Sequence, residues 1–228
     1  MPQAAIFDVD GTLVDSVDFH AGAWHEALEH FGHHVSFEEC RGQIGKGGDQ
    51  FIPVFLSQAE QNDHGKEMEE WRGKLFKSKY LPLIRPFSAV PELLRRVQEA
   101  GLKVAVASSA KANELDVYLE IAGVRHLVDV ATSSEDAEQS KPAPDIFRVA
   151  LKKLGMAGRD TVAIGDTPYD AQAAGKADIP TIGLLCGGFT ESELRKGGCI
   201  AVYPGPAALL ACFGASPLAP RQTTSQEP

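Results

Sequence analysis

The 228-residue chain has few cysteines, and their spacing excludes two kinds of site. Cys40, Cys186, Cys199 and Cys212 form no CxxC pair or other spacing typical of metal ligands. We therefore expect neither a disulfide scaffold nor a structural zinc site, but reduced thiols in a cytoplasmic protein. The sequence also has no run approaching the roughly 18 apolar residues of a membrane helix, and no signal-peptide pattern. We expect no membrane partner.

Positive charge is also scarce. The chain has 22 Lys and Arg against 31 Asp and Glu, a formal net charge of -9. Such a balance offers no broad basic face, so we expect no nucleic-acid partner. It leaves room for a small anionic substrate, because one local cation can outweigh a distant negative field. The hydrophobic share of 43% is typical of a globular protein, and the length predicts one or two domains.

What the chain does have is a series of short apolar runs without polar alternation, which is typical of buried parallel strands. Helical patterns lie between several of them, with Pro at the start or Gly at the end. This alternation predicts an α/β fold, a Rossmann-like parallel sheet flanked by helices. The expected strands are residues 3–7, 102–107, 127–131, 161–165 and 179–184, with a weaker sixth at 199–203, and the expected helices are residues 91–101, 112–123 and 144–155.

One long segment breaks the alternation. From about residue 16 to residue 85 we find no convincing strand, and residues 20–32 and 65–84 have helical periodicity. We expect an all-helical cap domain, residues 16–86, inserted after the first strand of a core made of residues 1–15 and 87–214. The Pro- and polar-rich residues 215–228 predict a flexible tail.

Polar side chains follow three of the predicted strands, and a lysine precedes a predicted helix. In open parallel sheets ligands bind beyond the carboxyl ends of the strands, so neighbouring strands would bring these side chains to one site. They are Asp8, Asp10, Ser108, Ser109, Asp166 and Asp170, with Lys141 as the lysine.

The carboxylates in this set need a positive charge beside them. Two carboxylates about 4 Å apart repel by roughly 4 kcal/mol at an effective dielectric near 20. Oxygen ligands without a nearby His or Cys favour Mg²⁺ as the balancing cation. Together with the Lys141 ammonium and the Ser108 hydroxyl, such an ion would form a cradle for a phosphoryl group.

Other interpretations of these motifs fit less well. An EF-hand loop starting at Asp8 would have Leu13 at its sixth position and Phe19 at its twelfth, where Gly and Glu are needed. A hairpin turn explains Asp10-Gly11 alone, but not the polar strand ends downstream. The glycine-rich stretch 44–51, IGKGGDQF, lacks the spacing of a phosphate-binding P-loop.

Four motifs in order resemble the haloacid dehalogenase (HAD) superfamily. They are DVDGT at residues 8–12, Ser108 at a strand end, Lys141, and GDTPYD at residues 165–170. The resemblance covers residues 1 to about 210, and a helical segment directly after the first motif is similar to the small cap of this superfamily.

The resemblance implies a role for each motif residue. Asp8 would be the nucleophile that forms an aspartyl-phosphate, and Asp10 would be the general acid and then the base. Mg²⁺ would be held by the Asp8 side chain, the Asp10 backbone carbonyl and Asp166, with Asp170 helping directly or through water. The phosphoryl group would be held by Ser108 and Lys141, next to Gly11, Thr12 and Ser109. Asp15 would belong to a hinge or a helix cap.

Because Asp10 is present, the pattern resembles that of phosphatases or sugar phosphomutases rather than dehalogenases or phosphonate hydrolases. His20 and Trp24 resemble residues of β-phosphoglucomutases that serve the acid/base step and the sugar pocket, although their spacing also allows them to pack on one helix face. Lys46 either contacts substrate or faces solvent. The glycine-rich loop around it and the Thr12 of DGT depart from the mutase pattern.

We therefore expect a Mg²⁺-dependent phosphatase of the phosphoglycolate-phosphatase kind, with a sugar phosphomutase as the alternative. A binding protein without catalysis is disfavoured, because every catalytic position holds a competent residue. The expected partner is a small phosphorylated metabolite, and the expected state is a monomer or a weak homodimer.

Overall fold

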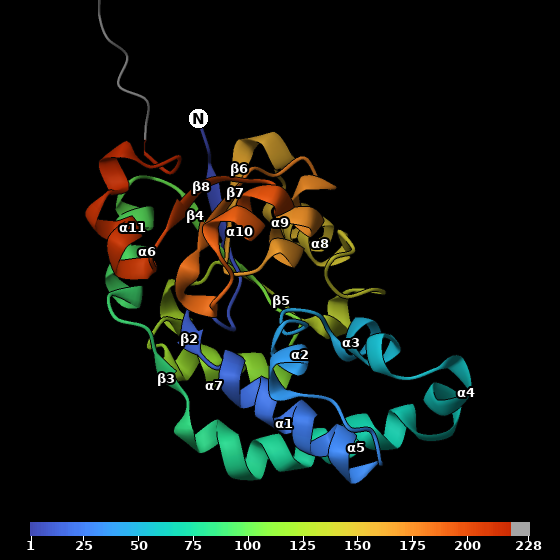
Figure 1. The fold of residues 1–228 in the computed structure, drawn as a ribbon. Helices are drawn as coiled ribbons and strands as arrows, with labels where there is room; N and C mark the ends of the chain where they lie inside the picture. Colours follow the sequence, from blue (N-terminus) through green and yellow to red (C-terminus); the bar gives the residue numbers. More distant parts are fainter. Residues whose placement is uncertain (220–228) are drawn as a thin grey trace, which may run out of the picture.

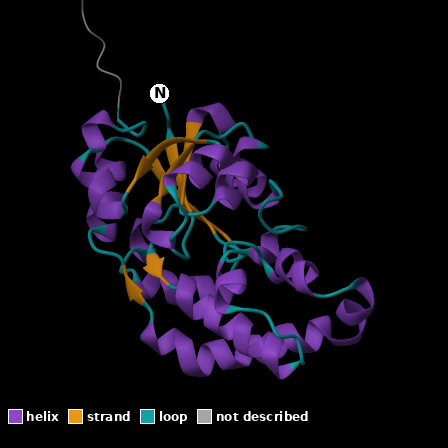
Figure 2. Cartoon of the chain, viewed as in Figure 1, coloured by secondary structure: helices purple, strands orange, loops and turns teal. Residues whose placement is uncertain are grey.

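A six-stranded parallel sheet forms the centre of the molecule (Figures 1 and 2). The structure is a computed structural model, and it describes residues 1–219. The strand order is β5-β4-β1-β6-β7-β8, which places the first strand between the two that precede Ser108 and Asp166. All six predicted strands are confirmed: β1 (Ala4–Phe7), β4 (Lys103–Ala107), β5 (Val130–Thr132), β6 (Thr161–Gly165), β7 (Thr181–Leu184) and β8 (Cys199–Tyr203).

Helices cover both faces of this sheet because its strands are apolar on both sides. Along β1, Ala5 and Phe7 belong to one buried cluster, whereas Ala4 and Ile6 belong to another. The first cluster includes buried side chains of α6 (Val90–Glu99), α7 (Ala112–Ile121) and α11 (Pro206–Ala211). The second includes side chains of α8 (Asp145–Leu154) and α9 (Pro168–Gly175).

The remaining short elements connect the core. Helix α10 (Glu191–Gly197) lies between β7 and β8, and its Leu194 is buried with Cys199. Single helical turns complete this part of the chain: η4 (Arg125–Leu127), η5 (Ser134–Asp136), η6 (Gly158–Asp160), η7 (Leu185–Gly187) and η8 (Phe213–Ala215).

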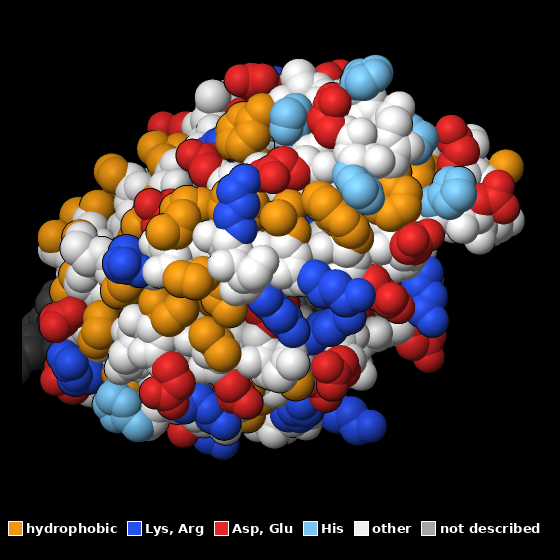
Figure 3. All heavy atoms as spheres, turned by 90° about the horizontal axis from the view of Figure 1, so that it is seen from below, with side chains coloured by type: hydrophobic (Ala, Val, Ile, Leu, Met, Phe, Trp, Pro, Cys, Tyr) orange, Lys and Arg blue, Asp and Glu red, His pale blue; other side chains and the backbone are white. Residues whose placement is uncertain are grey.

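The segment after β1 is helical, as predicted, and buries a core of its own around Trp24, Phe51 and Met68. In Figure 1 it lies below the sheet, and Figure 3 shows it from below, with acidic and basic side chains interspersed. This helical insertion comprises α1 (Val17–His30), α2 (Phe37–Arg41), α3 (Gly48–Phe55), α4 (Gln58–Glu60), η1 (Gln61–Gly65), α5 (Lys66–Leu75), η2 (Phe76–Tyr80) and η3 (Leu81–Leu83).

A two-stranded ribbon that the sequence did not predict joins the insertion to the core. Strand β2 (Val14–Asp15) pairs antiparallel with β3 (Arg85–Pro86), so Asp15 lies opposite Arg85. Two residues are too few to show the alternation by which a strand is recognised. Asp15 therefore lies where the chain enters the insertion. The N-cap residue of α1 is the next residue, Ser16, whose side chain makes no capping hydrogen bond to the helix.

The end of the described chain corrects one prediction. The sequence predicted a flexible tail from residue 215, but Ser216 is buried and Leu218 is fully buried in the first core cluster. The apolar side chain of Leu218 packs in the first core cluster, and the polar composition of the residues around it did not indicate this contact. The packed chain thus extends to Leu218, and the rest of the predicted tail, residues 220–228, lies outside the described residues. No helix within residues 1–219 is long and apolar enough to cross a membrane.

Candidate active site

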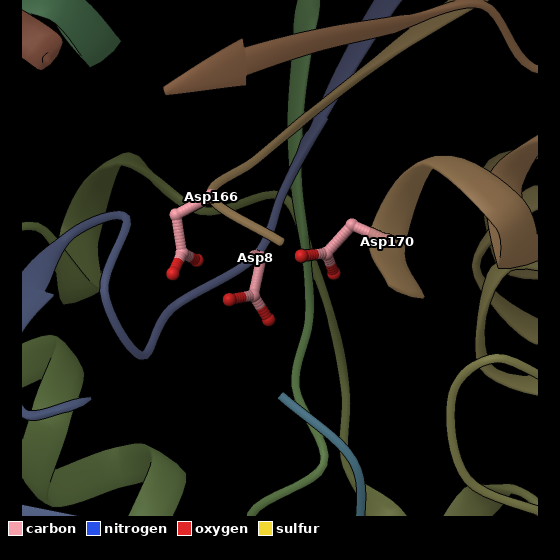
Figure 4. Close-up of side chains that lie close together, drawn as sticks. All are labelled: Asp8, Asp166 and Asp170. Carbon is pink, nitrogen blue, oxygen red and sulfur yellow. The ribbon is translucent and has the colours of Figure 1, made fainter. Parts of the chain in front are cut away.

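Three buried carboxylates meet beyond the ends of adjacent strands. Asp8 follows β1, Asp166 follows β6, and Asp170 lies in the first turn of α9, which follows β6. One oxygen from each lies within 4.8 Å of the others, and Figure 4 shows the three side chains converging. The strand order explains the meeting, because β1 and β6 are hydrogen-bonded neighbours.

The fold of the loop after β6 fixes the position of Asp170. Thr167 caps α9 in a capping box: the Thr167 hydroxyl donates to Asp170 Oδ2 at 2.7 Å, and its backbone N–H donates to the same oxygen at 3.1 Å. The other oxygen, Oδ1, lies 2.8 Å from the Lys141 ammonium. Asp170 therefore both stabilises a helix N-terminus and contributes a charge to the cluster.

Lys141 provides the positive charge inside the cluster. Its ammonium donates to Asp8 Oδ1 at 2.5 Å and to the Ala107 carbonyl oxygen at 2.8 Å, and its side chain is 1% exposed. Lys141 is therefore a buried charge of the core and not a solvated surface lysine. Burial lowers the pKa of Lys141, but the adjacent carboxylates of Asp170 and Asp8 raise it further, so the net shift is upward and the ammonium stays charged.

One ammonium does not neutralise three carboxylates. Burial raises the pKa of Asp8 to about 7, with Asp170 and Asp10 adding to the shift and Lys141 opposing it. The pKa of Asp166 is raised well above its usual value, by burial first and then by the charges of Asp8 and Asp170. The cluster thus favours a further cation or bound protons.

The donor set fits a divalent metal ion. Asp166 Oδ1 accepts a hydrogen bond from the Thr12 hydroxyl at 3.0 Å, but Oδ2 is buried without a hydrogen-bond partner among residues 1–219. A Cβ on Gly187 would lie 1.7 Å from this oxygen and one on Gly11 2.3 Å, so only glycine leaves the carboxylate its place. Asp8, Asp166 and Asp170 could hold a metal ion, and their all-oxygen chemistry suits a hard dication.

The carboxylate of Asp10 is not part of this group and has a different environment, and the predicted role of its backbone carbonyl as a metal ligand stays a prediction. Its Oδ1 accepts a hydrogen bond from the Ser16 hydroxyl at 2.6 Å and lies 2.9 Å from His20 Nε2. Burial raises the pKa of Asp10, but His20, then Ser16 and Arg72, together lower it below its usual value. The pKa values of Asp8 and Asp10 therefore shift in opposite directions, because burial dominates at Asp8 and the neighbouring donors dominate at Asp10.

Comparison with known proteins agrees with this geometry. The model of the family described as "Haloacid dehalogenase-like hydrolase" matches residues 5–184. The chain belongs to this family. The predictions of the superfamily and of a phosphatase-type enzyme within it are confirmed.

Individual relatives of this haloacid dehalogenase-like hydrolase are distant. A phosphoglycolate phosphatase of Vibrio parahaemolyticus is 29% identical, covering 79% of this chain and 82% of its own. The chloroplastic protein SUPPRESSOR OF QUENCHING 1 of Arabidopsis thaliana is 31% identical over 86% of this chain, but the chain spans only 19% of that protein. The crystal structure of a hydrolase from Pseudomonas syringae superimposes with a TM-score of 0.87 at 27% identity, covering 93% and 98% of the two chains.

In this hydrolase a cavity of about 300 Å³ lies beyond the carboxyl ends of the strands, between the core and the helical insertion. Asp8, Asp10 and Ser109 line it from the core. Ser108, the predicted phosphate ligand, is fully buried, and its hydroxyl accepts a hydrogen bond from the Ala110 N–H at 3.1 Å. Thr12 is likewise fully buried. Asp8 and Asp10 are thus the two carboxylates of the core motif that face the cavity.

The predicted insertion residues line the same cavity, and they also pack. His20 stacks on Phe76 with ring centroids 4.1 Å apart, and Trp24 stacks on Phe51 at 4.4 Å. Lys46 lines the cavity too, where its ammonium donates to Gln43 Oε1 at 2.5 Å. His20 and Trp24 thus pack as their spacing allowed and also line the cavity, and their functional roles stay predictions.

The sequence analysis missed Arg72 of α5, which lines the cavity and contacts His20. In the sequence it stands in KEMEEWRGKL among charges that read as a solvated helix face. Its position depends on contacts with Phe76, four residues later, and with His20 of α1. The second contact joins two separate helices, so the sequence around Arg72 does not indicate it. No local pattern marks such a residue.

Metal binding should depend on pH in a direction set by Asp8. Its pKa of about 7 lies above the ordinary aspartate value of 3.8, so between these pH values the folded chain keeps a proton that the unfolded chain has lost. The metal-free protein therefore loses stability as pH rises through this window. A dication competes with that proton, so its apparent affinity should rise by up to about tenfold per pH unit below pH 7 for each proton displaced.

We therefore expect the increase in Tm on adding Mg²⁺ to be larger at pH 8 than at pH 5.5, measured by differential scanning calorimetry against EDTA-treated protein. Asp166→Asn should abolish the increase at both pH values. A Tm increase of the same size at both pH values would contradict a site built on these carboxylates.

Proposed function

We propose that the chain is a Mg²⁺-dependent phosphatase that hydrolyses a small phosphate monoester, of the phosphoglycolate-phosphatase kind, through an aspartyl-phosphate on Asp8. One observation carries the proposal: two carboxylates face one cavity from opposite chemical environments. Asp8 contacts Lys141 and belongs to the group of three buried carboxylates that could hold a metal ion, whereas Asp10 is hydrogen-bonded to Ser16 and His20.

This arrangement separates a nucleophile from an acid/base. The Asp8 carboxylate attacks phosphorus, and the bond to the leaving oxygen breaks as Asp10 donates a proton to that oxygen. In the second half, Asp10 takes a proton from water as the water oxygen attacks the aspartyl-phosphate, which returns the Asp8 carboxylate and releases inorganic phosphate. Lys141 is placed to hold Asp8 and to stabilise negative charge beside it.

Mg²⁺, held by Asp8, Asp166 and Asp170, would neutralise charge on the phosphoryl group when bound. The fit rests on Oδ2 of Asp166, which has no hydrogen-bond partner in the described part of the chain, and on the raised pKa values of Asp8 and Asp166. The small substrate follows from the cavity, whose volume of about 300 Å³ lies at the low end of ligand pockets. A small phosphorylated metabolite is also in keeping with the phosphoglycolate phosphatase among the relatives.

The test is release of inorganic phosphate from a panel of small monoesters, including phosphoglycolate and sugar phosphates. We expect release that depends on Mg²⁺ and stops with EDTA, because the carboxylate cluster needs a cation to accept an anionic substrate. No Mg²⁺-dependent release from any member of the panel would contradict the proposal.

The same assay tests the alternative function, a sugar phosphomutase. The contact between His20 of the insertion and Asp10 of the core favours this alternative. A mutase would convert β-glucose 1-phosphate to glucose 6-phosphate, stimulated by a bisphosphate, with little release of phosphate. A phosphatase would release phosphate and transfer none to a second sugar phosphate.

A further inference from the structure

The imidazole of His20 is held in one orientation. Phe76 stacks on one face at 4.1 Å with the rings 5° from parallel, and Tyr118 meets it edge-on at 84°. His20 is 7% exposed. Because the ring has little freedom to turn, the groups that face its two nitrogens can be assigned individually.

The Nδ1 nitrogen faces a donor. Arg72 Nη2 lies within hydrogen-bonding distance of it, and a guanidinium has N–H donors but no acceptor. The guanidinium itself makes cation–π contacts, with its Cζ 5.1 Å from the ring centroid of Trp24 and 5.0 Å from that of Phe76. His20 Nδ1 must therefore be the acceptor, with its lone pair directed at Arg72.

The Nε2 nitrogen faces two acceptors. Asp10 Oδ1 lies 2.9 Å away and the Tyr118 hydroxyl oxygen 3.2 Å away. The Tyr118 hydroxyl donates its own hydrogen to Glu114 Oε1 at 2.8 Å, so its oxygen is free to accept. Nε2 must therefore carry the hydrogen.

From these contacts we infer that Arg72 is a positioning residue that fixes His20 as the neutral Nε2–H tautomer, so that His20 is a permanent hydrogen-bond donor to Asp10 rather than a proton carrier. The polarity of three independent partners, Arg72, Asp10 and Tyr118, selects this tautomer, since the hydrogen bond at one ring nitrogen decides what the other can do.

This tautomer has a consequence for the acid/base step, which rests on the proposed phosphatase function. Ser16 and His20 both donate to Asp10 Oδ1, which leaves Oδ2 as the oxygen for exchanging a proton with the substrate or water. A proton taken up by Asp10 cannot move on to His20, because Nε2 already bears a hydrogen and the Nδ1 lone pair is engaged by Arg72. The proton therefore stays on the carboxylate.

The two hydrogen bonds to Oδ1 also fix the Asp10 side chain. A carboxylate that receives two fixed hydrogen bonds on one oxygen is held in one rotamer, so its free oxygen points to one place. Arg72 thus acts on Asp10 through His20.

The test is ¹⁵N NMR of the histidine side chains in the full-length protein, with the His20 signal identified by its disappearance in His20→Gln. In the wild type we expect His20 to show hydrogen on Nε2. In Arg72→Met, whose stem can still pack on the rings of Trp24 and Phe76, Nδ1 loses its donor while Nε2 still faces Asp10, so we expect a second hydrogen to appear on Nδ1 under conditions where the wild type shows none. Arg72→Lys keeps a donor-only group and should retain the wild-type signal.

Kinetics give a second measurement. Arg72→Met should lower kcat by about tenfold, a part of the 10²–10⁴ that general acid–base catalysis contributes, with KM changed less than about threefold. Arg72→Lys should restore most of kcat. A raised KM with unchanged kcat would overturn the positioning role in favour of substrate binding.

The two proposals can fail separately. Hydrogen on Nδ1 of His20 in the wild type would overturn the tautomer assignment whatever the enzyme hydrolyses, and this measurement needs no variant to fold. Absence of phosphatase activity together with the Nε2–H signal would contradict the proposed function alone.

Discussion

Asp8→Asn is expected to lower the rate of phosphate release by about 10³-fold or more, because an amide cannot attack phosphorus as a carboxylate does. The substitution keeps the size of the side chain and one oxygen that can accept from Lys141, which now lies 2.5 Å from Asp8 Oδ1. It also removes one charge from a crowded group of carboxylates, so the folded structure should persist. The measurement is kcat for the best monoester of the panel at saturating Mg²⁺.

Asp63→Asn is the matched control, since it makes the same change at an exposed position of η1. It should leave kcat within about twofold, as surface changes usually leave a distant site intact. Thermal unfolding of both variants shows whether they are folded. Activity of folded Asp8→Asn within about tenfold of the wild type would rule out Asp8 as the nucleophile.

Lys141→Met is expected to have the largest effect on stability. Removing one partner of a buried ion pair typically costs about 3–5 kcal/mol, because the other charge is left buried and unpaired. Here two carboxylates lose their partner, since the ammonium lies 2.5 Å from Asp8 and 2.8 Å from Asp170. The free energy of unfolding in urea, with EDTA present, measures the loss.

The loss should also depend on pH. Protonation removes the unpaired charge, so the destabilisation should be smaller at pH 5.5 than at pH 8, following the pKa of Asp8 that already lies near 7. The control is Lys153→Met, which removes an exposed ion pair with Asp136 at 2.9 Å. That pair should contribute about 0–1 kcal/mol at either pH. Equal losses for the two variants would show that Lys141 does not neutralise the cluster.

The core and its motif residues could be predicted because each leaves a local mark in the sequence. A buried strand appears in the sequence as an apolar run. Asp8 and Asp166 stand directly after such runs, where burying a carboxylate costs free energy. Parallel pairing then carries these ends to one edge of the sheet. The strand order β4-β1-β6 makes these residues neighbours, and the sequence of no single strand predicts that order.

The environment of His20 could not be predicted, because its parts come from separate helices. Arg72 is supplied by α5 and Tyr118 by α7, and in the sequence both fit ordinary helical patterns. Their contacts depend on the rotation of each helix about its axis and on the distance between the insertion and the core. Neither quantity has a signature in a single sequence, whereas Asp8 and Asp166 are marked in the sequence by the strands that they directly follow.

The pairing of β2 with β3 has an evolutionary consequence. Asp15 and Arg85 are direct partners across the ribbon, so the 69 residues between them leave and rejoin the core at adjacent points. A segment whose two ends lie side by side can be lengthened, shortened or exchanged without pulling on the strands beneath it. Strand β1 and the carboxylates of Asp8, Asp166 and Asp170 can therefore stay unchanged during evolution, while the helical insertion that lines the cavity changes and alters which molecules the cavity accepts.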